Sequence, residues 1–236
     1  MKNSFLYLVV AGLMIVAASC QQGGTSNVKV ETPIDSVSYA IGVLVGTNNN
    51  QQLENVPGDD KMNIEVMAAA FRKTSLGEET EMTPEEANAL IQKFFTEASE
   101  KEAQGNLEEG NKFLEENKAR EGVHTTESGL QYEILVEGDG EKPSATDQVR
   151  VHYHGTLIDG TVFDSSVEGG EPAVFGVNRV IPGWTEALQL MPVGSKWKVY
   201  VPSNLAYGPR GAGGDIGPNE TLIFEVELLE IVKGDK

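Results

Sequence analysis

The sequence has a single cysteine and few basic residues. Cys20 is the only cysteine among 236 residues, so no disulfide can form within the chain and the folded part must rely on its core. The chain carries 36 acidic and 18 basic side chains, which gives a net charge of −18. This charge repels phosphate backbones and anionic lipid. We therefore expect no nucleic-acid partner and no docking onto a membrane by charge alone.

The sequence also lacks the motifs of metal, phosphate and covalent chemistry. It has no Gly-rich phosphate loop, no Cys/His metal spacing and no serine in a nucleophile elbow. His152 and His154 share one face of a predicted strand, but two imidazoles without carboxylate support rarely make a tight metal site. We expect surface histidines, no metal and no cofactor. The sequence therefore lacks the residues that acyl transfer, phosphoryl transfer and metal-dependent hydrolysis require.

One apolar run lies at the N-terminus. Residues 5–18 carry no charge, but this run is shorter than the roughly 20 residues that a membrane-spanning helix needs. It follows Lys2 and ends in small residues before Cys20, which is typical of a signal peptide over residues 1–20. The end of the run resembles a bacterial lipobox, which implies that Cys20 carries the lipid of the mature protein. The alternative is an ordinary secretory signal with an incidental cysteine.

A polar tether at 21–32 is followed by a segment with apolar residues at helical spacing. Residues 33–76 predict two short helices, with Asp35 and Asn63 as candidate N-caps. These helices are too few to bury their apolar faces alone. We expect the domain to self-associate, because a domain of this size can bury these faces against a second copy.

The strongest helix signal begins at residue 83. Thr83-Pro84-Glu85-Glu86 is a capping box with proline at the first helical position, and predicts a helix that extends toward Glu121. Its apolar stripe fades after Ser99, and Gly105 and Gly110 weaken the helix by about 1 kcal/mol each relative to alanine. A polar helix without a buried face usually bridges domains. We expect residues 33–121 to form a helical domain that ends in a connecting helix.

The periodicity changes from helical to alternating at about residue 122. An Asp159-Gly160 pair marks a tight hairpin turn. A short helix is predicted at 182–190, and strands are predicted at 131–136, 148–158, 161–163, 196–201 and 221–232. Antiparallel strands with one short helix indicate an α+β fold for residues 122–236, in which a curved sheet wraps around a helix.

This part of the chain contains a set of aromatic and aliphatic residues with few polar groups. Each residue alone is ordinary core material. Tyrosine and tryptophan, however, need partners for their polar tips when they are buried. The candidate residues are Tyr153, Phe163, Asp164, Val180, Ile181, Trp184, Tyr207, Ile216 and Phe224.

Five sequence blocks resemble the FKBP-type peptidyl-prolyl cis-trans isomerases. They occur in family order and at family spacing between residues 126 and 233. The blocks are VHYHG at 151–155, GTVFDSS at 160–166, VIPGW at 180–184, LAYG at 205–208 and NETLIFEVEL at 219–228. The helical part resembles the dimerising N-terminal domain of envelope proteins of the macrophage infectivity potentiator class, through residues 35–42, the long helix and the domain order.

The resemblance implies an enzyme that rotates the peptide bond before proline and needs no cofactor. It implies a homodimer in the bacterial envelope, in the periplasm and anchored by lipid to the outer membrane. Its expected partners are unfolded or proline-containing polypeptides, and macrolide inhibitors are possible ligands. The implied catalytic residues are Tyr153, Phe163, Asp164, Ile181 and Tyr207, and the implied substrate-binding residues are Val180, Trp184, Ile216 and Phe224.

The resemblance also implies individual roles. Trp184 would form the pocket floor, while the Ile181 N–H and the Tyr207 hydroxyl would hold substrate carbonyls. Asp164 would accept a hydrogen bond that orients Tyr153 or the substrate, although it can also stabilise the turn before Ser165. Ala173 stands where the family often has an aromatic residue, which would open one wall.

Two other functions stay open at this stage. The chain can be a holdase chaperone whose cleft grips unfolded proteins, with incidental isomerase activity. It can also be a structural envelope lipoprotein with an isomerase fold that has lost its activity. The polar groups of Tyr153, Asp164 and Tyr207 argue against the second alternative, because an inactive pocket would not need them.

Overall fold

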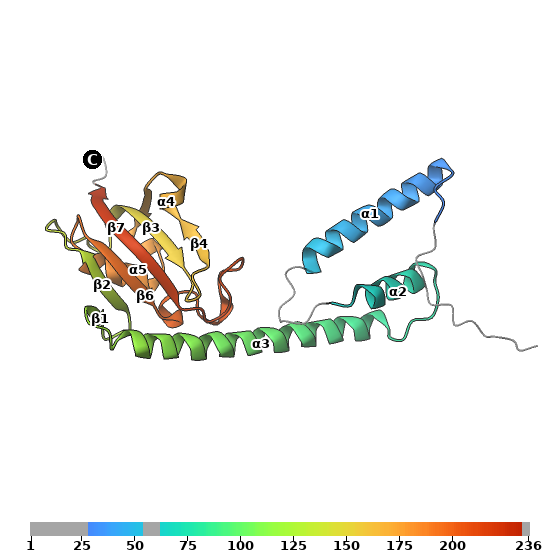
Figure 1. Ribbon diagram of the computed structural model, residues 1–236, viewed down its shortest axis with the longest axis horizontal. Helices are drawn as coiled ribbons and strands as arrows, with labels where there is room; N and C mark the ends of the chain where they lie inside the picture. Colours follow the sequence, from blue (N-terminus) through green and yellow to red (C-terminus); the bar gives the residue numbers. More distant parts are fainter. Residues whose placement is uncertain (1–27, 54–61, 233–236) are drawn as a thin grey trace, which may run out of the picture. The chain divides into compact units, whose positions relative to one another are not determined.

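A computed structural model describes residues 28–53 and 62–232 (Figure 1). Contacts divide the chain into two units, one up to Asn55 and one from Val56 onward. The predicted signal segment 1–20, with Cys20, and most of the tether 21–32 lie outside the described residues. Within the described ranges, no helix is both long and apolar enough to cross a membrane.

The first unit contains α1, which spans Pro33–Leu53. Thr32, and not Asp35, precedes the helix as its cap. The Asp35 carboxylate accepts from the Thr32 N–H at 2.8 Å, and the Asp35 N–H donates to Thr32 Oγ1 at 3.2 Å. The prediction of Asp35 as N-cap is therefore wrong, because Pro33 is tolerated in the first turn and the helix starts earlier. At 21 residues α1 is also longer than the short helix predicted, since the polar run 48–52 stays helical.

In the second unit, α2 spans Ile64–Ser75, and α3 spans Pro84–Asn117. The predicted cap of α2 is confirmed, since the Val66 N–H donates to Asn63 Oδ1 at 3.2 Å. The capping box of α3 is confirmed as well. The Glu86 N–H donates to Thr83 Oγ1 at 3.2 Å, and the Thr83 N–H donates to Glu86 Oε2 at 2.8 Å.

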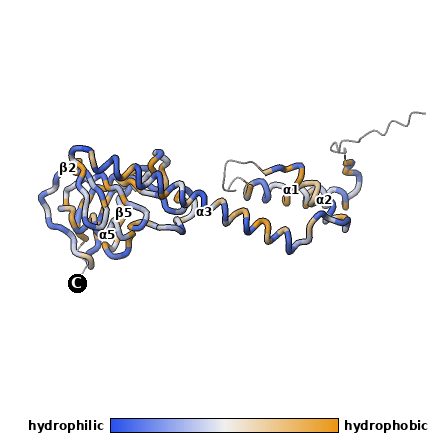
Figure 2. Tube along the Cα trace, turned by 90° about the horizontal axis from the view of Figure 1, so that it is seen from below, coloured by the Kyte–Doolittle hydropathy of each residue, from blue (hydrophilic) through white to orange (hydrophobic). Residues whose placement is uncertain are grey.

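The two halves of α3 differ in what their side chains contact. Figure 2 shows apolar positions recurring along its first half, and residues there such as Leu90 and Phe94 are exposed. In the second half, Gly110 and Asn117 are buried. The prediction of a polar half without a buried face is therefore wrong. Gly110 is required by a close approach, because a Cβ at this position would collide with the side chain of Thr221.

The sheet of the second unit is antiparallel and has seven strands in the order β1-β2-β6-β7-β3-β4, with β5 paired to β3. All five predicted strands are confirmed to within two residues at either end. Strands β1 and β5 were not predicted, because runs of three and four residues are too short to show alternation. The strands are β1 (Val123–Thr125), β2 (Gln131–Val136), β3 (Gln148–Thr156), β4 (Val162–Ser165), β5 (Ala173–Gly176), β6 (Lys196–Val201) and β7 (Leu222–Val232).

Helix α5 (Pro182–Leu190) supplies the other layer of the core. Its buried residues Trp184, Ala187 and Leu188 belong to one apolar cluster with alternate residues of β3, β6 and β7, including Val151 and Leu228. The α+β prediction is confirmed. Four short helical segments lie between the strands: α4 (Ser166–Gly169) and the 3₁₀ turns η1 (Val177–Arg179), η2 (Ser203–Leu205) and η3 (Gly208–Arg210).

Candidate active site

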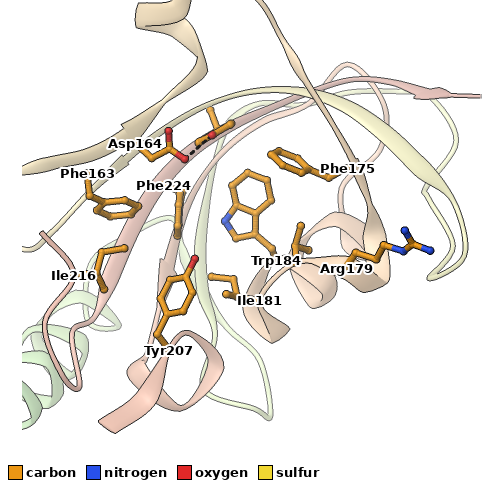
Figure 3. Close-up of a pocket in the computed structure, with 11 residues that line it drawn as sticks. Phe163, Asp164, Phe175, Arg179, Ile181, Trp184, Tyr207, Ile216 and Phe224 are labelled. Carbon is orange, nitrogen blue, oxygen red and sulfur yellow. Dashed lines mark hydrogen bonds between the residues drawn. The ribbon is translucent and has the colours of Figure 1, made fainter. Parts of the chain in front are cut away.

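All nine candidate residues of the sequence line one pocket of about 550 Å³ (Figure 3). They come from β3, β4, α5, β7 and the loops before α5 and β7, so the fold gathers residues that lie up to 71 positions apart. Phe175 and Arg179 complete the lining. The lining is mostly apolar, and Asp164 and Arg179 are its only charged side chains among the described residues.

Trp184 lies at the buried base of the pocket, with only 3% of its surface exposed. Three rings meet it edge to face: Phe224 at a centroid distance of 5.2 Å, Tyr153 at 5.4 Å and Phe175 at 5.8 Å. This arrangement places ring edges against ring faces, which is favoured electrostatically. Its buried Nε1–H has no hydrogen-bond partner among the described residues. Three aromatic rings therefore hold Trp184 at the base of the pocket, and within the described part of the chain its N–H is an unpaired donor there.

Gly155 on β3 leaves room for the rings of Phe163 and Phe224. A Cβ at Gly155 would lie 2.7 Å from two ring carbons of Phe163 and 3.0 Å from Phe224. These rings also meet each other edge to face, at a centroid distance of 5.4 Å. Gly155 is thus the position at which the sheet backbone contacts the aromatic wall directly.

The Tyr153 hydroxyl donates a hydrogen bond of 2.6 Å to Asp164 Oδ2. Burial raises the pKa of the Tyr153 hydroxyl, and the hydrogen bond to the Asp164 carboxylate raises it further. The phenol therefore stays protonated at physiological pH and remains a donor. The cap of α4 is formed by the neighbouring residue, since Ser165 Oγ accepts from the Glu168 N–H at 3.3 Å.

Ile181 and Tyr207 contribute two further polar groups at the pocket. Ile181 precedes Pro182, and proline forces the preceding residue out of the helical region. Its φ of −60° and ψ of 151° make it the N-cap of α5. The side chain of Tyr207 is 44% exposed, and Figure 3 shows its hydroxyl pointing into the pocket.

Sequence reasoning missed Phe175 and Arg179. Phe175 lies on β5, two residues after Ala173, and its ring contacts Trp184 and Tyr153. An aromatic residue therefore reaches the pocket from the strand where an open wall was predicted at Ala173. The signal available for Phe175 was its place two residues from Ala173, on the same face of a strand. Arg179 carried no such signal, because it lies in a three-residue turn.

The two strand histidines lie outside the pocket and contact serines. His152 Nδ1 is 3.2 Å from Ser166 Oγ, and His154 Nδ1 is 3.1 Å from Ser165 Oγ. Among the residues that the structure describes, no group of three His, Cys, Asp or Glu side chains is placed to hold a metal ion.

The chain matches two sequence families. Residues 139–229 match the FKBP-type peptidyl-prolyl cis-trans isomerases, and residues 34–134 match the domain that is amino-terminal to such isomerases. The two matches together cover most of the described residues.

Characterised relatives agree with these matches. The chain is 44% identical to the outer membrane protein MIP of Legionella longbeachae, over 96% of this chain and 97% of the relative. It is 49% identical to the FKBP-type 22 kDa peptidyl-prolyl cis-trans isomerase of Escherichia coli, over 83% and 94%. The crystal structure of FkpA from Escherichia coli aligns with a TM-score of 0.67 at 34% identity, over 86% of this chain and 98% of FkpA. The chain therefore belongs to the FKBP-type peptidyl-prolyl cis-trans isomerases and shares their enzymatic activity.

Proposed function

We propose that the protein assists the folding of exported proteins by binding the X–Pro bond of a client in this pocket and stabilising its twisted amide without covalent chemistry. Rotation about the bond has a barrier of about 18–20 kcal/mol, because the resonance of the planar amide is lost. No bond breaks, so neither a nucleophile nor an acid–base pair is required. The apolar lining around Trp184 is the observation that carries the proposal.

The apolar environment acts on the difference between two states of the substrate. A planar amide is more dipolar than a twisted one, so transfer from water into an apolar pocket disfavours the planar ground state more than the transition state. Only such differential stabilisation accelerates a reaction. In this proposal Val180, Trp184, Ile216 and Phe224 surround the prolyl ring. Phe163 closes the wall beside Phe224, which its ring contacts edge to face.

The polar groups hold the peptide on either side of proline. The Ile181 N–H and the Tyr207 hydroxyl donate to substrate carbonyls. Asp164 fixes the ring of Tyr153 through the 2.6 Å hydrogen bond. A fixed ring keeps the pocket in one shape, so less free energy is spent on ordering it when the substrate binds.

The test is acceleration of isomerisation of a short Xaa-Pro peptide by residues 27–236, beside the Asp164→Leu and Tyr207→Phe variants. We expect clear acceleration by the unmodified protein and a fall in kcat/KM of about tenfold or more in Asp164→Leu, which corresponds to about 1.4 kcal/mol. Tyr207→Phe keeps the ring and should lose less. A folded Asp164→Leu protein with full activity would exclude the proposed role of Asp164.

We also propose that residues 33–121 form a homodimer. In α2 and the first half of α3, Val66, Phe71, Leu90 and Ile91 are each more than half exposed. Large exposed apolar side chains gathered on neighbouring helical segments are typical of an interaction site. Sedimentation equilibrium of the full protein should give twice the monomer mass, and Phe71→Glu combined with Leu90→Glu should give the monomer. A monomeric unmodified protein at micromolar concentration would refute this proposal.

The same surface supports a second candidate function. An apolar region beside an isomerase domain can hold unfolded chains, so a holdase activity can coexist with catalysis. The discriminating test is suppression of aggregation of a proline-free client by the Asp164→Leu variant. Undiminished suppression would show that client holding does not depend on catalysis, and absence of suppression by the unmodified protein would leave catalysis alone.

The proposed location is the bacterial envelope, on the periplasmic side and anchored to the outer membrane through a lipid on Cys20. Support comes from the lipobox-like end of the first 20 residues and from the printed name of the Legionella relative, an outer membrane protein. Metabolic labelling with a fatty acid, with Cys20→Ser as the control, tests it. Label in the unmodified protein alone is expected, and an unlabelled, fully secreted protein would refute the anchor.

A further inference from the structure

We propose that α3 positions one wall of the catalytic pocket, by holding the rim loop (residues 208–220) through a pair of asparagine side chains. The inference rests on the proposed use of the pocket. It assigns Asn106, on a helix that the motifs of the isomerase domain do not include, as a positioning residue for the reaction.

Two hydrogen bonds run in opposite directions between the helix and the rim loop. Asn106 Nδ2 on α3 donates to the Pro218 carbonyl at 2.9 Å. Asn219 Nδ2 on the loop donates to the Ala103 carbonyl of α3 at 3.1 Å. We call this pair the asparagine clasp. Both bonds are partly buried. Loss of the Asn106 donor would leave the Pro218 carbonyl poorly paired, and loss of the Asn219 donor would remove the second link between loop and helix.

The loop end of the clasp has an unusual backbone. Asn219 has a φ of +57°, and it is the one non-glycine residue with positive φ among the described residues. Asparagine tolerates this left-handed conformation better than most residues do. The Asn219 N–H also donates to the Gly208 carbonyl at 2.8 Å, which ties the two ends of the rim loop together. The side chain therefore docks the loop at the point where the loop closes.

Two pocket residues lie on or beside this closed loop. Tyr207 directly precedes Gly208. Ile216 lies two residues before Pro218, is 9% exposed, and has its carbonyl bonded to the Ala212 N–H at 3.0 Å. Both residues line the pocket. A displacement of Pro218 and Asn219 would therefore move the Ile216 wall and the hydroxyl proposed to hold a substrate carbonyl.

The helix approaches the loop closely along this contact. A Cβ at Gly217, the residue between Ile216 and Pro218, would lie 2.8 Å from Glu102 Oε1. Gly110, two helical turns beyond Glu102, lies directly against Thr221. The helix thus follows the loop from residue 102 to Thr221, which directly precedes β7.

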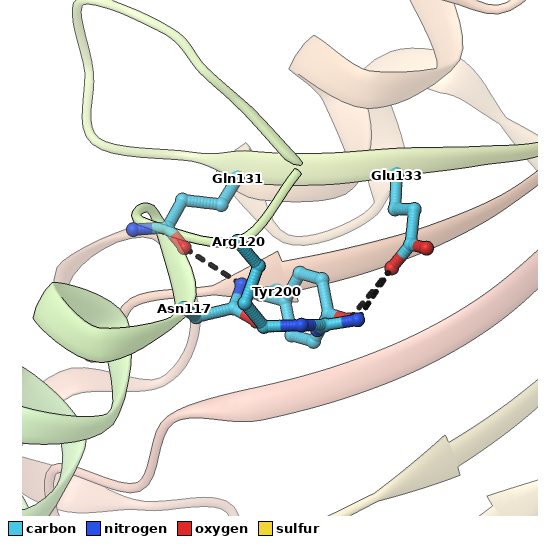
Figure 4. Close-up of polar contacts among 5 residues, drawn as sticks. All are labelled: Asn117, Arg120, Gln131, Glu133 and Tyr200. Carbon is cyan, nitrogen blue, oxygen red and sulfur yellow. Dashed lines mark hydrogen bonds and ion pairs between the residues drawn. The ribbon is translucent and has the colours of Figure 1, made fainter. Parts of the chain in front are cut away.

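A second contact of α3 provides an internal control. Asn117 Nδ2 donates to Gln131 Oε1 at 2.8 Å, and Arg120, just after the helix, donates to the Tyr200 hydroxyl at 3.0 Å and to Glu133 at 3.2 Å (Figure 4). These partners lie on β2 and β6, and none of the five residues lines the pocket. The second contact attaches the same helix to the sheet without touching the rim loop.

The experiment compares three variants of the full protein in peptide isomerisation and thermal unfolding. Asn106→Asp preserves shape but replaces the donor with a carboxylate oxygen that faces the Pro218 carbonyl. Asn219→Gly keeps the left-handed backbone accessible and removes only the side-chain bond. Asn117→Ala weakens the second contact. We expect kcat/KM to fall about three- to tenfold in the first two variants, mainly through KM, because a displaced wall weakens binding before it affects the rotation itself.

The controls separate positioning from stability. Asn117 is more buried than Asn106, so Asn117→Ala should lower Tm the most and yet keep kcat/KM within about twofold of the unmodified protein. The double variant Asn106→Asp with Asn219→Gly should lose less than the product of the two single losses, because both remove one clasp.

Two results would overturn the inference. One is unchanged KM and kcat in both clasp variants. The other is a loss of kcat/KM in Asn117→Ala equal to that in Asn106→Asp, which would show that any loosening of α3 has the same effect. Failure of the proposed function would look different, because the unmodified protein itself would then give no acceleration or would be unaffected by Asp164→Leu.

Discussion

The helical part and the sheet part of this protein differ in where their apolar side chains lie. In the sheet part Leu130, Val151 and Leu228 have no exposed surface, whereas in the helical part Leu90 and Phe71 are each 56% exposed. Burial of apolar surface is the main favourable term in folding. The sheet part therefore contains its own source of stability, whereas the apolar side chains of α2 and α3 stay exposed, which motivates the proposed dimer.

We therefore expect the stability of the two parts to depend differently on protein concentration. A domain with its own core has a stability that does not depend on concentration. A surface completed by a second chain has a stability that follows mass action.

The first prediction compares one leucine from each part. Leu228→Ala removes a fully buried side chain from the core cluster and should lower the free energy of unfolding by about 2–5 kcal/mol. Leu90→Ala removes an exposed one and should change the stability of the monomer by less than about 0.5 kcal/mol. Urea unfolding followed by circular dichroism at two protein concentrations measures both. The contrast breaks down if Leu90→Ala destabilises as much as Leu228→Ala at every concentration.

The second prediction concerns Gly155, where the sheet backbone meets the pocket. A Cβ there must displace Phe163 or Phe224. Gly155→Ala should lower kcat/KM by about tenfold, and overpacking of this kind usually costs about 1–3 kcal/mol of stability. Gly160→Ala is a matched control with open space around it, and its positive φ of 90° limits the effect to stability. Equal activity of the two folded variants would contradict the importance of the aromatic wall.

The third prediction concerns charge at the pocket. Among the described residues, Arg179 is the one cationic side chain that lines the pocket. Arg179→Gln should lower kcat/KM about two- to threefold for a Glu-Pro peptide and leave a Leu-Pro peptide unchanged, because exposed charge pairs contribute less than about 1 kcal/mol. Assays at low and high salt check the electrostatic origin. Equal loss for both peptides would point to a packing role instead.

The fourth prediction concerns the pH dependence of stability near the clasp. Burial raises the pKa of Glu220, and the carboxylates of Asp159, Glu109 and Glu102 raise it further. A carboxyl whose folded pKa is raised favours folding most at low pH, and this contribution is lost as pH rises through the folded value. Glu220→Gln should therefore raise Tm by about 1–2 °C at pH 7 and have less effect near pH 4. A fall in Tm at pH 7 would show that the charged form is stabilised.

The sequence predicted the fold class, and the nine candidate residues that it indicated line one pocket. This worked because strand alternation on β3 and β7 fixes which residues face α5, and because the motif blocks cover the loops between strands. Phe175 and Arg179 were not predicted, because the segments that hold them are too short. They lie on a four-residue strand and a three-residue turn, where no periodicity develops.

The docking of α3 could not be predicted from local sequence. Asn106 and Pro218 lie 112 positions apart, and a hydrogen bond between a side-chain amide and a backbone carbonyl leaves no periodic pattern. Gly110 is the clearest example. From the sequence alone, a glycine inside a helix predicts only a lower helix stability, and the position of Thr221 is needed to explain why a larger residue cannot be there.

The continuity of α3 has a consequence for how such proteins can be recombined. The helix runs unbroken from Pro84 to Asn117, and its residues 102–110 contact the rim loop and Thr221, which directly precedes β7. A gene fusion with its junction at residue 122 would carry the catalytic motifs but leave Asn106 and Gly110 behind. The transferable unit therefore begins inside the helix, near residue 102, and a junction placed there would let the isomerase be grafted onto other helical partners with its pocket intact.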